Sequence, residues 1–238
     1  MQRLLPPPTE ALGSSQLNDA YRCPAPDQWR DGRWLRVNFV MSLDGAIVGS
    51  TGVSRTLGTD ADRQVFRIAR EQCDVVLVGA GTVRAEDYSP SPRPIAIASR
   101  QLDLPSTLRI FAERGPEHVR PMVMTTQAAI HAAPAWLHDQ AELVACGDVT
   151  VRPRSMVDAL TTRGLTRILC EGGPALFGDL LREDLVDELL LTISPLLVGA
   201  TSPDHLVAIP GGLNPPARFT PIQVIEQDGT VLTRLRRH

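Results

Sequence analysis

Two glycine-rich turns follow apolar stretches and lead into expected helices, an arrangement that can bind an anion. The first turn contains Gly79-Ala80-Gly81, within VVLVGAGTVRAED, and the second contains Gly172-Gly173, within ILCEGGPALFGDL. Glycine lets the backbone approach a ligand closely and adopt positive φ angles. A helix that begins there directs unpaired N–H groups and the positive end of its dipole at the same point. The turns therefore predict a phosphate site, although glycine at such a junction often serves the turn alone.

Neither turn carries a complete nucleotide-binding fingerprint. Gly79-Ala80-Gly81 opens like Gly-x-Gly-x-x-Gly, but Arg84 stands at the third glycine and no acid follows at a strand end about 20 residues later. Gly173 and Gly178 have P-loop spacing, but Asp179 follows where a P-loop has lysine. All 24 basic residues are arginine. Anions must therefore be held by arginine, hydroxyl or backbone N–H groups, and mechanisms that need a lysine amine are excluded.

A regular alternation of strands and helices would position these turns. The strands are predicted over 35–41, 46–48, 74–82, 93–99, 120–126, 141–147, 167–173 and 187–199. The helices are predicted over 59–73, 154–164 and 174–184, and a turn is predicted at Ser42–Gly45. Thr59 is the expected N-cap of the first helix, and Asp62 three residues later gives a variant of the capping box. An antiparallel hairpin over 217–237 turns at Asp228-Gly229.

This order of elements predicts an α/β fold with a mixed central sheet that is predominantly parallel and ends in an antiparallel hairpin. In open α/β sheets, ligands bind at the carboxyl ends of strands, where both glycine turns lie. Residues 1–30 are polar and proline-rich, so we expect an arm laid on the surface with at most a short helix near Thr9–Leu12. Residues 31–238 are expected to form one domain.

Composition narrows the class of protein. The net charge of −3 over 238 residues argues against a nucleic-acid or polyanion binder. No apolar run is long enough for a membrane helix, and no signal peptide is evident, so we expect a cytoplasmic protein. The four cysteines and five histidines show no metal-ligand spacing, so no metal site is expected.

Several stretches together resemble one family. VNFVMSLDGAIV, DVVLVGAGTVRAEDY and RILCEGGPALFGDLLREDLVDELLLTISPLLVG resemble the reductase domain of the bacterial riboflavin-biosynthesis deaminase/reductase, which is related in fold to dihydrofolate reductase. The resemblance covers Trp34 to Gly199, and Glu-Gly-Gly-Pro followed by Leu-Val-Asp-Glu-Leu is its most specific part. It implies a dihydrofolate-reductase-like three-layer α/β/α fold, commonly as a homodimer. It also implies that NADPH reduces the ribosyl group of 5-amino-6-(5-phosphoribosylamino)uracil, or its non-deaminated analogue, to ribityl. The family's deaminase domain has no counterpart here, so a stand-alone reductase is expected.

The resemblance also implies ligand contacts, though no proton donor. The substrate contacts are Ser54, Arg70, Arg93 and Glu171. The arginines would bind the 5′-phosphate, and Glu171 would accept from the pyrimidine. The NADPH contacts are Met41, Thr56, Gly79, Gly81, Thr82, Glu86, Ser99, Arg100, Gly172, Gly173, Pro174, Ala175, Leu176, Phe177, Gly178 and Asp179. Among these, Gly173 to Asp179 would cradle the pyrophosphate and Arg100 would pair with the 2′-phosphate.

The sequence departs from the family where Thr56 replaces a frequent aromatic residue, where Glu86 replaces aspartate, and in SPSPR, which leaves the register of Arg93 open. Two alternative functions stay open. One is reduction of a dihydropterin, although dihydrofolate reductases use a buried acid near the first helix and we match none here. The other is a dinucleotide-binding module without turnover. LVDELLLTI could line a dimer interface, but a core strand is the favoured interpretation.

Overall fold

The computed structural model describes residues 1–112, 115–199 and 205–238. Its strands are β1 (Gln2–Leu5), β2 (Glu10–Ala11), β3 (Trp34–Met41), β4 (Val75–Gly79), β5 (Ile95–Ala98), β6 (Met122–Thr125), β7 (Glu142–Ala145), β8 (Arg167–Cys170), β9 (Glu188–Ile193), β10 (Phe219–Gln227) and β11 (Thr230–Arg237). Its helices are α1 (Ser14–Ala20), α2 (Asp60–Glu71), α3 (Ala80–Glu86), α4 (Gln127–His131), α5 (Ala135–Gln140), α6 (Pro153–Thr162) and α7 (Pro174–Arg182).

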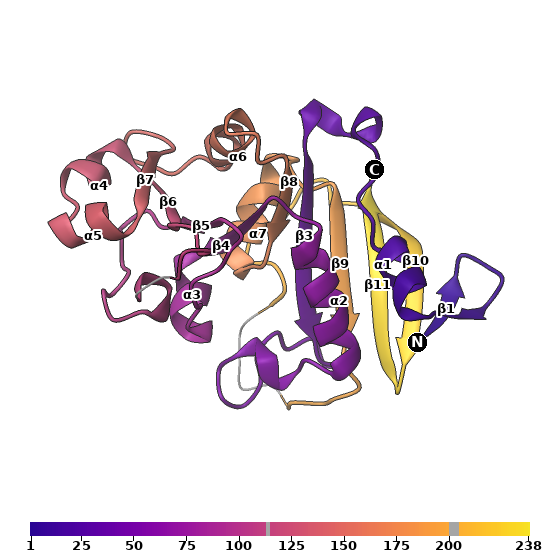
Figure 1. Ribbon diagram of the computed structural model, residues 1–238. Coiled ribbons are helices and arrows are strands. Elements are labelled where there is room, and N and C mark those ends of the chain that lie inside the picture. Colours follow the sequence, from indigo (N-terminus) through magenta and orange to yellow (C-terminus); the bar gives the residue numbers. More distant parts are fainter. Residues whose placement is uncertain (113–114, 200–204) are drawn as a thin grey trace.

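The described strands form one sheet in the order β2-β1-β10-β11-β9-β3-β8-β4-β5-β6-β7 (Figure 1). From β9 to β7 all neighbours run parallel, whereas β11, β10, β1 and β2 add antiparallel pairs at the other side. The predicted α/β fold, with a mainly parallel sheet and a C-terminal antiparallel hairpin, is confirmed. β8 lies between β3 and β4, although it follows both of them in the sequence by a long interval.

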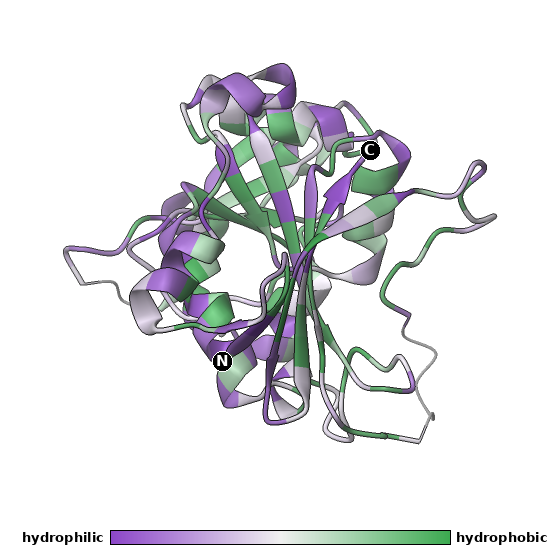
Figure 2. Ribbon diagram, turned by 90° about the vertical axis from the view of Figure 1, so that its right-hand side faces the viewer, coloured by the Kyte–Doolittle hydropathy of each residue, from purple (hydrophilic) through white to green (hydrophobic). Residues whose placement is uncertain are grey.

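Helices cover both faces of the sheet, as the edge-on view of Figure 2 shows. One buried apolar cluster lies on the side of α1, α2, α3 and α5, and includes Leu17, Val65, Val83 and Leu137. A second cluster on the opposite face includes residues of α6 and α7, such as Leu160. Because the central strands are buried on both faces by these two clusters, their sequences are almost continuously apolar. None of the helices that the structure describes has the length and apolarity needed to cross a membrane.

Helix α2 lines the functional cavity described below, and its N-terminus is fixed by two hydrogen bonds to Thr59. Thr59 is the N-cap, and its Oγ1 accepts a hydrogen bond from the Asp62 backbone N–H at 3.3 Å. The Thr230 hydroxyl of β11 also donates to this oxygen at 3.1 Å, which fixes the helix N-terminus against the sheet. Buried residues such as Val65 and Ala69 face the core. The helix predicted here is confirmed.

The N-terminal segment is part of the fold, so its description as a surface arm was wrong. β1 pairs with β10 and extends the sheet, while Leu17 and Tyr21 are buried. The short helix expected near Thr9–Leu12 is also wrong, because β2 occupies Glu10–Ala11 and α1 starts at Ser14. The expectation that residues 31–238 form one domain stays a prediction.

The expected strand over 46–48 is likewise absent, and this stretch forms no regular element. The turn that precedes it is confirmed, with the Gly45 N–H donating to the Ser42 carbonyl at 3.0 Å. The Asp44 carboxylate accepts from the Ser42 hydroxyl and from the N–H groups of Val198 and Gly199. These hydrogen bonds lower the pKa of Asp44 to about 2 and tie the turn to the chain after β9.

A buried ion network attaches the N-terminal segment to the central strands. Glu188 on β9 accepts from Arg36 on β3 and from Arg234 on β11. Both arginines also donate to backbone carbonyls of the N-terminal segment, including that of Tyr21. Burial alone would raise the pKa of Glu188, but the two guanidinium charges hold it below its usual value. Removing one partner of such a buried ion pair costs free energy, because a charge is left without its counter-ion. The network therefore fixes the register of these strands.

Candidate active site

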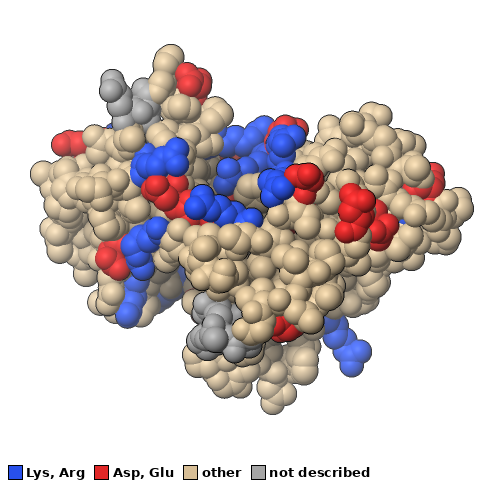
Figure 3. Space-filling view, turned by 90° about the horizontal axis from the view of Figure 1, so that it is seen from below, with Lys and Arg blue, Asp and Glu red and all other residues tan. Residues whose placement is uncertain are grey.

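A cavity of about 1360 Å³ opens at the carboxyl ends of β3, β4, β5 and β8. These strands run parallel, so the segments that follow them meet at one edge of the sheet. Figure 3 views the molecule from below, and arginine side chains gather there around a hollow between two lobes. The cavity is lined by arginines from several elements: Arg55, Arg63, Arg70, Arg84, Arg100 and Arg109. The site is therefore suited to ligands with several negative charges.

The two glycine turns meet inside this cavity. The Gly79 N–H donates to the Gly172 carbonyl at 2.9 Å, so the ends of β4 and β8 are joined directly. Gly173 is the N-cap of α7 and gives no side-chain cap, which leaves the first N–H groups of this helix without an intrahelical partner. The Gly172–Gly173 peptide is cis. The predicted convergence of glycine backbone and a helix N-terminus is present.

The glycines leave space that a side chain would fill. A Cβ at Gly173 would lie 3.1 Å from the Thr82 Oγ1, and one at Gly79 would lie 3.4 Å from the Gly173 nitrogen. Gly172 has a φ of +95°, and a Cβ there would lie 3.2 Å from the Phe39 ring. Since an L side chain rarely adopts that φ, Gly172 is required for the turn itself. The backbone of Gly79, Gly172 and Gly173 and the start of α7 form what we call the glycine cradle. This cradle thus fits a phosphate group that approaches the backbone.

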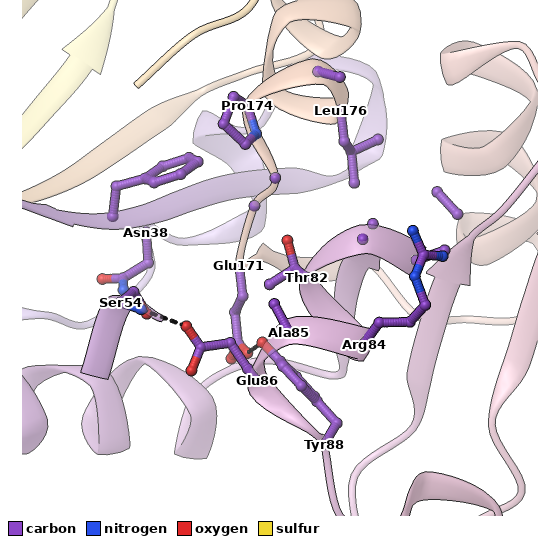
Figure 4. Close-up of a pocket in the computed structure, with 18 of the residues that line it drawn as sticks. Asn38, Ser54, Thr82, Arg84, Ala85, Glu86, Tyr88, Glu171, Pro174 and Leu176 are labelled. Carbon is purple, nitrogen blue, oxygen red and sulfur yellow. Dashed lines mark hydrogen bonds between the residues drawn. The ribbon is translucent and has the colours of Figure 1, made fainter. Parts of the chain in front are cut away.

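Directly before Gly172 in the chain, Glu171 is held by two neighbours. The Nε and Nη2 of Arg70 each donate to one Glu171 oxygen at 2.6 Å. The Tyr88 hydroxyl donates to Oε2 of Glu171 at 2.7 Å, and Figure 4 shows these two side chains together. The Phe66 ring lies 4.6 Å from the guanidinium carbon of Arg70. Burial would lower the pKa of Arg70, but the hydrogen bonds and charge of Glu171 raise it. Burial, reinforced by the Glu171 charge, raises the pKa of Tyr88, so its hydroxyl stays protonated at neutral pH.

This arrangement changes the expected roles of two residues. Arg70 and Glu171 both line the cavity as predicted, but they form a bidentate pair with each other. Such a pair has fixed geometry, so it forms a rigid wall of the site. The Nη1 of Arg70 takes no part in this pair and makes no hydrogen bond to the described residues, so it remains able to donate to a ligand.

A second contact bridges the two sides of the cavity. The Ser54 backbone N–H, in the loop after β3, donates to Oε1 of Glu86 on α3 at 2.6 Å (Figure 4). The loop that carries Ser54 and Thr56 is thereby attached to the helix that carries Thr82. The two elements are far apart in sequence, so the hydrogen bond closes one side of the cavity.

The structure gathers most of the predicted site residues at this cavity. Its lining includes Ser54, Arg70, Gly79, Gly81, Thr82, Glu86, Ser99, Arg100, Glu171, Gly172, Gly173, Pro174, Ala175, Leu176 and Asp179. Their individual ligand contacts stay predictions.

Arg93 is placed elsewhere, which corrects its expected phosphate contact. Its Nη1 donates to the Cys73 carbonyl at 2.7 Å and its Nη2 to the Glu71 carbonyl at 2.6 Å. These carbonyls lie at the C-terminal end of α2, where a cation is favoured by the helix dipole. Arg93 therefore caps a helix and does not line the cavity.

Four of the predicted cofactor contacts also lie outside the cavity lining. Phe177 packs on Phe39 in the core at a centroid distance of 5.5 Å, and a Cβ at Gly178 would lie 2.6 Å from the Ala208 carbonyl oxygen. A helix turns once in 3.6 residues, so the run from Gly173 to Asp179 cannot face one ligand throughout. Met41 packs against the apolar cluster on the α6 and α7 side. The Thr56 hydroxyl donates to the Val53 carbonyl at 3.0 Å.

Several lining residues were missed from the sequence: Asn38, Asp62, Phe66 and Tyr88. Asp62, Phe66 and Arg70 recur at four-residue spacing, which places them on one side of α2. This spacing was available as a signal, but Asp62 was interpreted only through the capping pattern with Thr59. Asp62 is a buried acid near the start of a helix at the cavity. The sequence-based objection to a pterin substrate, that no such acid could be matched, therefore no longer holds.

A model of the RibD C-terminal domain matches residues 33–231. The chain belongs to this family. Among its RibD C-terminal domain relatives is the 2,5-diamino-6-ribosylamino-4(3H)-pyrimidinone 5′-phosphate reductase of Methanothermobacter thermautotrophicus. The two are 29% identical over 184 residues, which cover 73% of this chain and 83% of that protein. The riboflavin biosynthesis protein RibD of Mycobacterium tuberculosis is 29% identical over 161 residues, 68% of this chain and 42% of RibD.

The fold agrees with that of solved members of the RibD type. A pyrimidine reductase-like protein from Corynebacterium diphtheriae superposes with a TM-score of 0.77 at 22% identity, covering 87% of this chain and 93% of that one. The α/β fold expected from the sequence is thus shared over most of both chains.

The placement of Arg93 in this RibD C-terminal domain gives a testable consequence. We expect Arg93→Ala to lower the free energy of unfolding by about 1–3 kcal/mol, because two carbonyls at the end of α2 lose charged donors. Urea denaturation measures this loss, and Arg67→Ala, at an exposed position of the same helix, should change stability by less than about 0.5 kcal/mol. A rise in KM for a phosphorylated substrate with unchanged stability would instead restore a substrate role for Arg93.

Proposed function

We propose that the protein is an NADPH-dependent reductase of riboflavin biosynthesis that converts the ribosyl group of a phosphorylated aminopyrimidine to ribityl. The substrate would be 2,5-diamino-6-ribosylamino-4(3H)-pyrimidinone 5′-phosphate or its deaminated uracil counterpart. The observation that carries this proposal is the cavity in which a backbone anion cradle faces a wall of α2 that ends in Arg70. Membership of the RibD C-terminal domain family and the reductase among its relatives support it.

The cofactor side of the cavity is the glycine cradle. The N–H groups at the start of α7 and the backbone of Gly172 and Gly173 would hold the pyrophosphate of NADPH. Arg100 follows Ser99 at the cavity and makes no hydrogen bond or ion pair through its side chain to the described residues. It would therefore be available for the 2′-phosphate, which would select NADPH over NADH. The bound nicotinamide would supply the hydride.

The substrate side is formed by α2 and the loop before it. With Arg93 committed to the end of α2, two other groups are the best placed for the 5′-phosphate. One is Arg55, which lines the cavity and has no partner among the described residues. The other is the Nη1 of Arg70, whose plane is fixed by Glu171 and Phe66. Since the positive charge of Arg70 compensates the negative charge of Glu171, the carboxylate in this wall does not repel the anionic end of the substrate.

A homodimer and a cytoplasmic location, both expected from the sequence, stay predictions. Reduction of a dihydropterin is the second candidate function, and the buried acid Asp62 at the cavity favours keeping it.

One assay separates these functions. NADPH consumption is followed spectrophotometrically with the diaminopyrimidinone phosphate, with its uracil counterpart and with dihydrofolate. We expect turnover of a phosphorylated pyrimidine and little or none with dihydrofolate. Faster turnover of dihydrofolate would favour the pterin function, whereas NADPH binding without turnover of any substrate would favour a non-catalytic module.

The cofactor side can be tested independently of turnover. Gly173→Ala should raise the Kd for NADPH at least about tenfold, because its Cβ would stand between the cradle and Thr82. The matched variant Gly178→Ala, on the same helix, should lower thermal stability by disturbing the contact with Ala208 while leaving the Kd within about twofold. Fluorescence titration with NADPH measures both constants, and equal losses of affinity would refute this placement of the pyrophosphate.

A further inference from the structure

Asp62 is a buried carboxyl group whose setting no other acid at the cavity shares. It is only 9% exposed and lines the cavity from the first turn of α2. Burial raises its pKa, while hydrogen bonding to the Thr192 side chain and the charge of Arg63 act in the opposite direction. Arg63 is itself occupied, because its guanidinium donates to the Gly58 carbonyl and to Asp60. In the part of the chain that the structure describes, Thr192 is the sole hydrogen-bonding side chain for this carboxyl.

The other acids around the cavity have committed partners. Glu171 is bonded to Arg70 and Tyr88, and Glu86 accepts from the Ser54 N–H. Asp103 lies against Arg84 at 3.1 Å. Desolvating a carboxylate costs free energy unless hydrogen bonds compensate for it. Asp62 therefore presents the strongest unsatisfied demand for hydrogen-bond donors in this site.

The position of Asp62 along α2 indicates which part of a substrate it meets. Asp62, Phe66 and Arg70 follow one another at four-residue spacing, so the carboxyl lies roughly 12 Å along the helix axis from Arg70. Phe66 lies between them and lines the cavity with the Arg70 guanidinium over its ring, so the stripe joins an acid, an aromatic ring and a cation. Of the two candidate phosphate ligands, Arg55 lies near Asp62, because a Cβ at Gly58 would be 3.6 Å from the Arg55 carbonyl oxygen and 3.0 Å from the Asp62 Oδ2. We therefore take Arg70, at the far end of the stripe, as the phosphate contact here. A ribosylaminopyrimidine laid along this stripe would direct its ring edge farthest from the ribose at Asp62.

We propose that Asp62 reads this distal edge of the pyrimidine and makes the enzyme select the 2-amino over the 2-oxo substrate. The proposal rests on the reductase function proposed above. In the 2-amino-4-oxopyrimidine, N3–H and the 2-amino group are adjacent donors that match the two oxygens of one carboxylate. In the uracil counterpart, the C2 carbonyl replaces the amino group and its lone pairs would face the carboxylate. One acceptor opposed to another in a buried site is strongly disfavoured.

The test compares kcat/KM for the two phosphorylated pyrimidines in the wild-type protein and in Asp62→Asn. We expect the wild type to prefer the 2-amino substrate by on the order of 10- to 100-fold. Asparagine offers one acceptor and one donor, which match the C2 carbonyl and N3–H of uracil. Asp62→Asn should therefore abolish or reverse the preference. Asp60→Asn, at an exposed acid on the same helix turn, should retain it.

The outcomes distinguish this inference from the proposed function. If the wild type reduces neither pyrimidine, the function itself is wrong. If it reduces both and Asp62→Asn leaves their ratio unchanged, or lowers both rates by the same factor, Asp62 does not read the ring and the inference is overturned.

A binding measurement on the wild type gives a test that does not depend on folding of the variant. The 2-amino base 2,5,6-triamino-4(3H)-pyrimidinone should compete with substrate more strongly than 5,6-diaminouracil. Equal inhibition by the two bases would also overturn the proposal.

Discussion

The direct contact between the ends of β4 and β8 is the constraint on which the site depends. The Gly79 N–H donates to the Gly172 carbonyl, and the backbone of Gly173 lies so close that a Cβ at Gly79 would reach van der Waals contact with its nitrogen. This approach requires β8 to enter the sheet between β3 and β4. It places the start of α7 over the cavity, with Glu171 one residue before the glycines. Without this contact the anion cradle and the Glu171 wall would not face the same space.

The cavity has two chemically different sides, and because the chain lacks lysine both must bind anions through backbone N–H groups, hydroxyl groups or arginine. On the cradle side, backbone N–H groups provide the donors, and they carry no side-chain charge that solvent or a neighbouring acid could compete for. On the α2 side, arginine is held in plane by a carboxylate and by an aromatic ring. Planar, delocalised guanidinium groups tolerate such burial better than ammonium groups do. Under the proposed function, a dinucleotide would bind on the first side and a phosphorylated pyrimidine on the second.

Much of the fold and of the candidate site could be predicted from the sequence, because apolar runs and glycine turns are local patterns. Apolar runs bounded by glycine turns predicted the parallel strands, and the turns predicted that glycine backbone and a helix N-terminus would meet at one edge of the sheet. Side chains whose direction depends on long-range packing could not be predicted in the same way. Arg93 turns to the end of α2 because two carbonyls there need a donor, and Phe177 and Gly178 face the core and a loop because a helix can present only one side to a ligand. Asp62 was hidden by its own capping pattern, since its N–H forms the predicted cap while its carboxyl faces the cavity. The N-terminal segment has a polar, proline-rich composition, yet it joins the sheet. A few of its apolar residues are buried, and Arg36 of β3 and Arg234 of β11 donate to its backbone carbonyls.

The central claim is that this cavity aligns the nicotinamide of NADPH with the ribose-derived carbon of an aminopyrimidine. It is tested most directly by transfer of an isotope. NADPH deuterated at C4 of the nicotinamide, on the face that the enzyme uses, is incubated with the protein and the diaminopyrimidinone phosphate, and the product is analysed by mass spectrometry and NMR. The account predicts a ribityl product that carries the deuterium at C1, the carbon attached to the pyrimidine amino nitrogen. A reduced product without deuterium from either labelled face, or a deuterium in the pyrimidine ring, would contradict it.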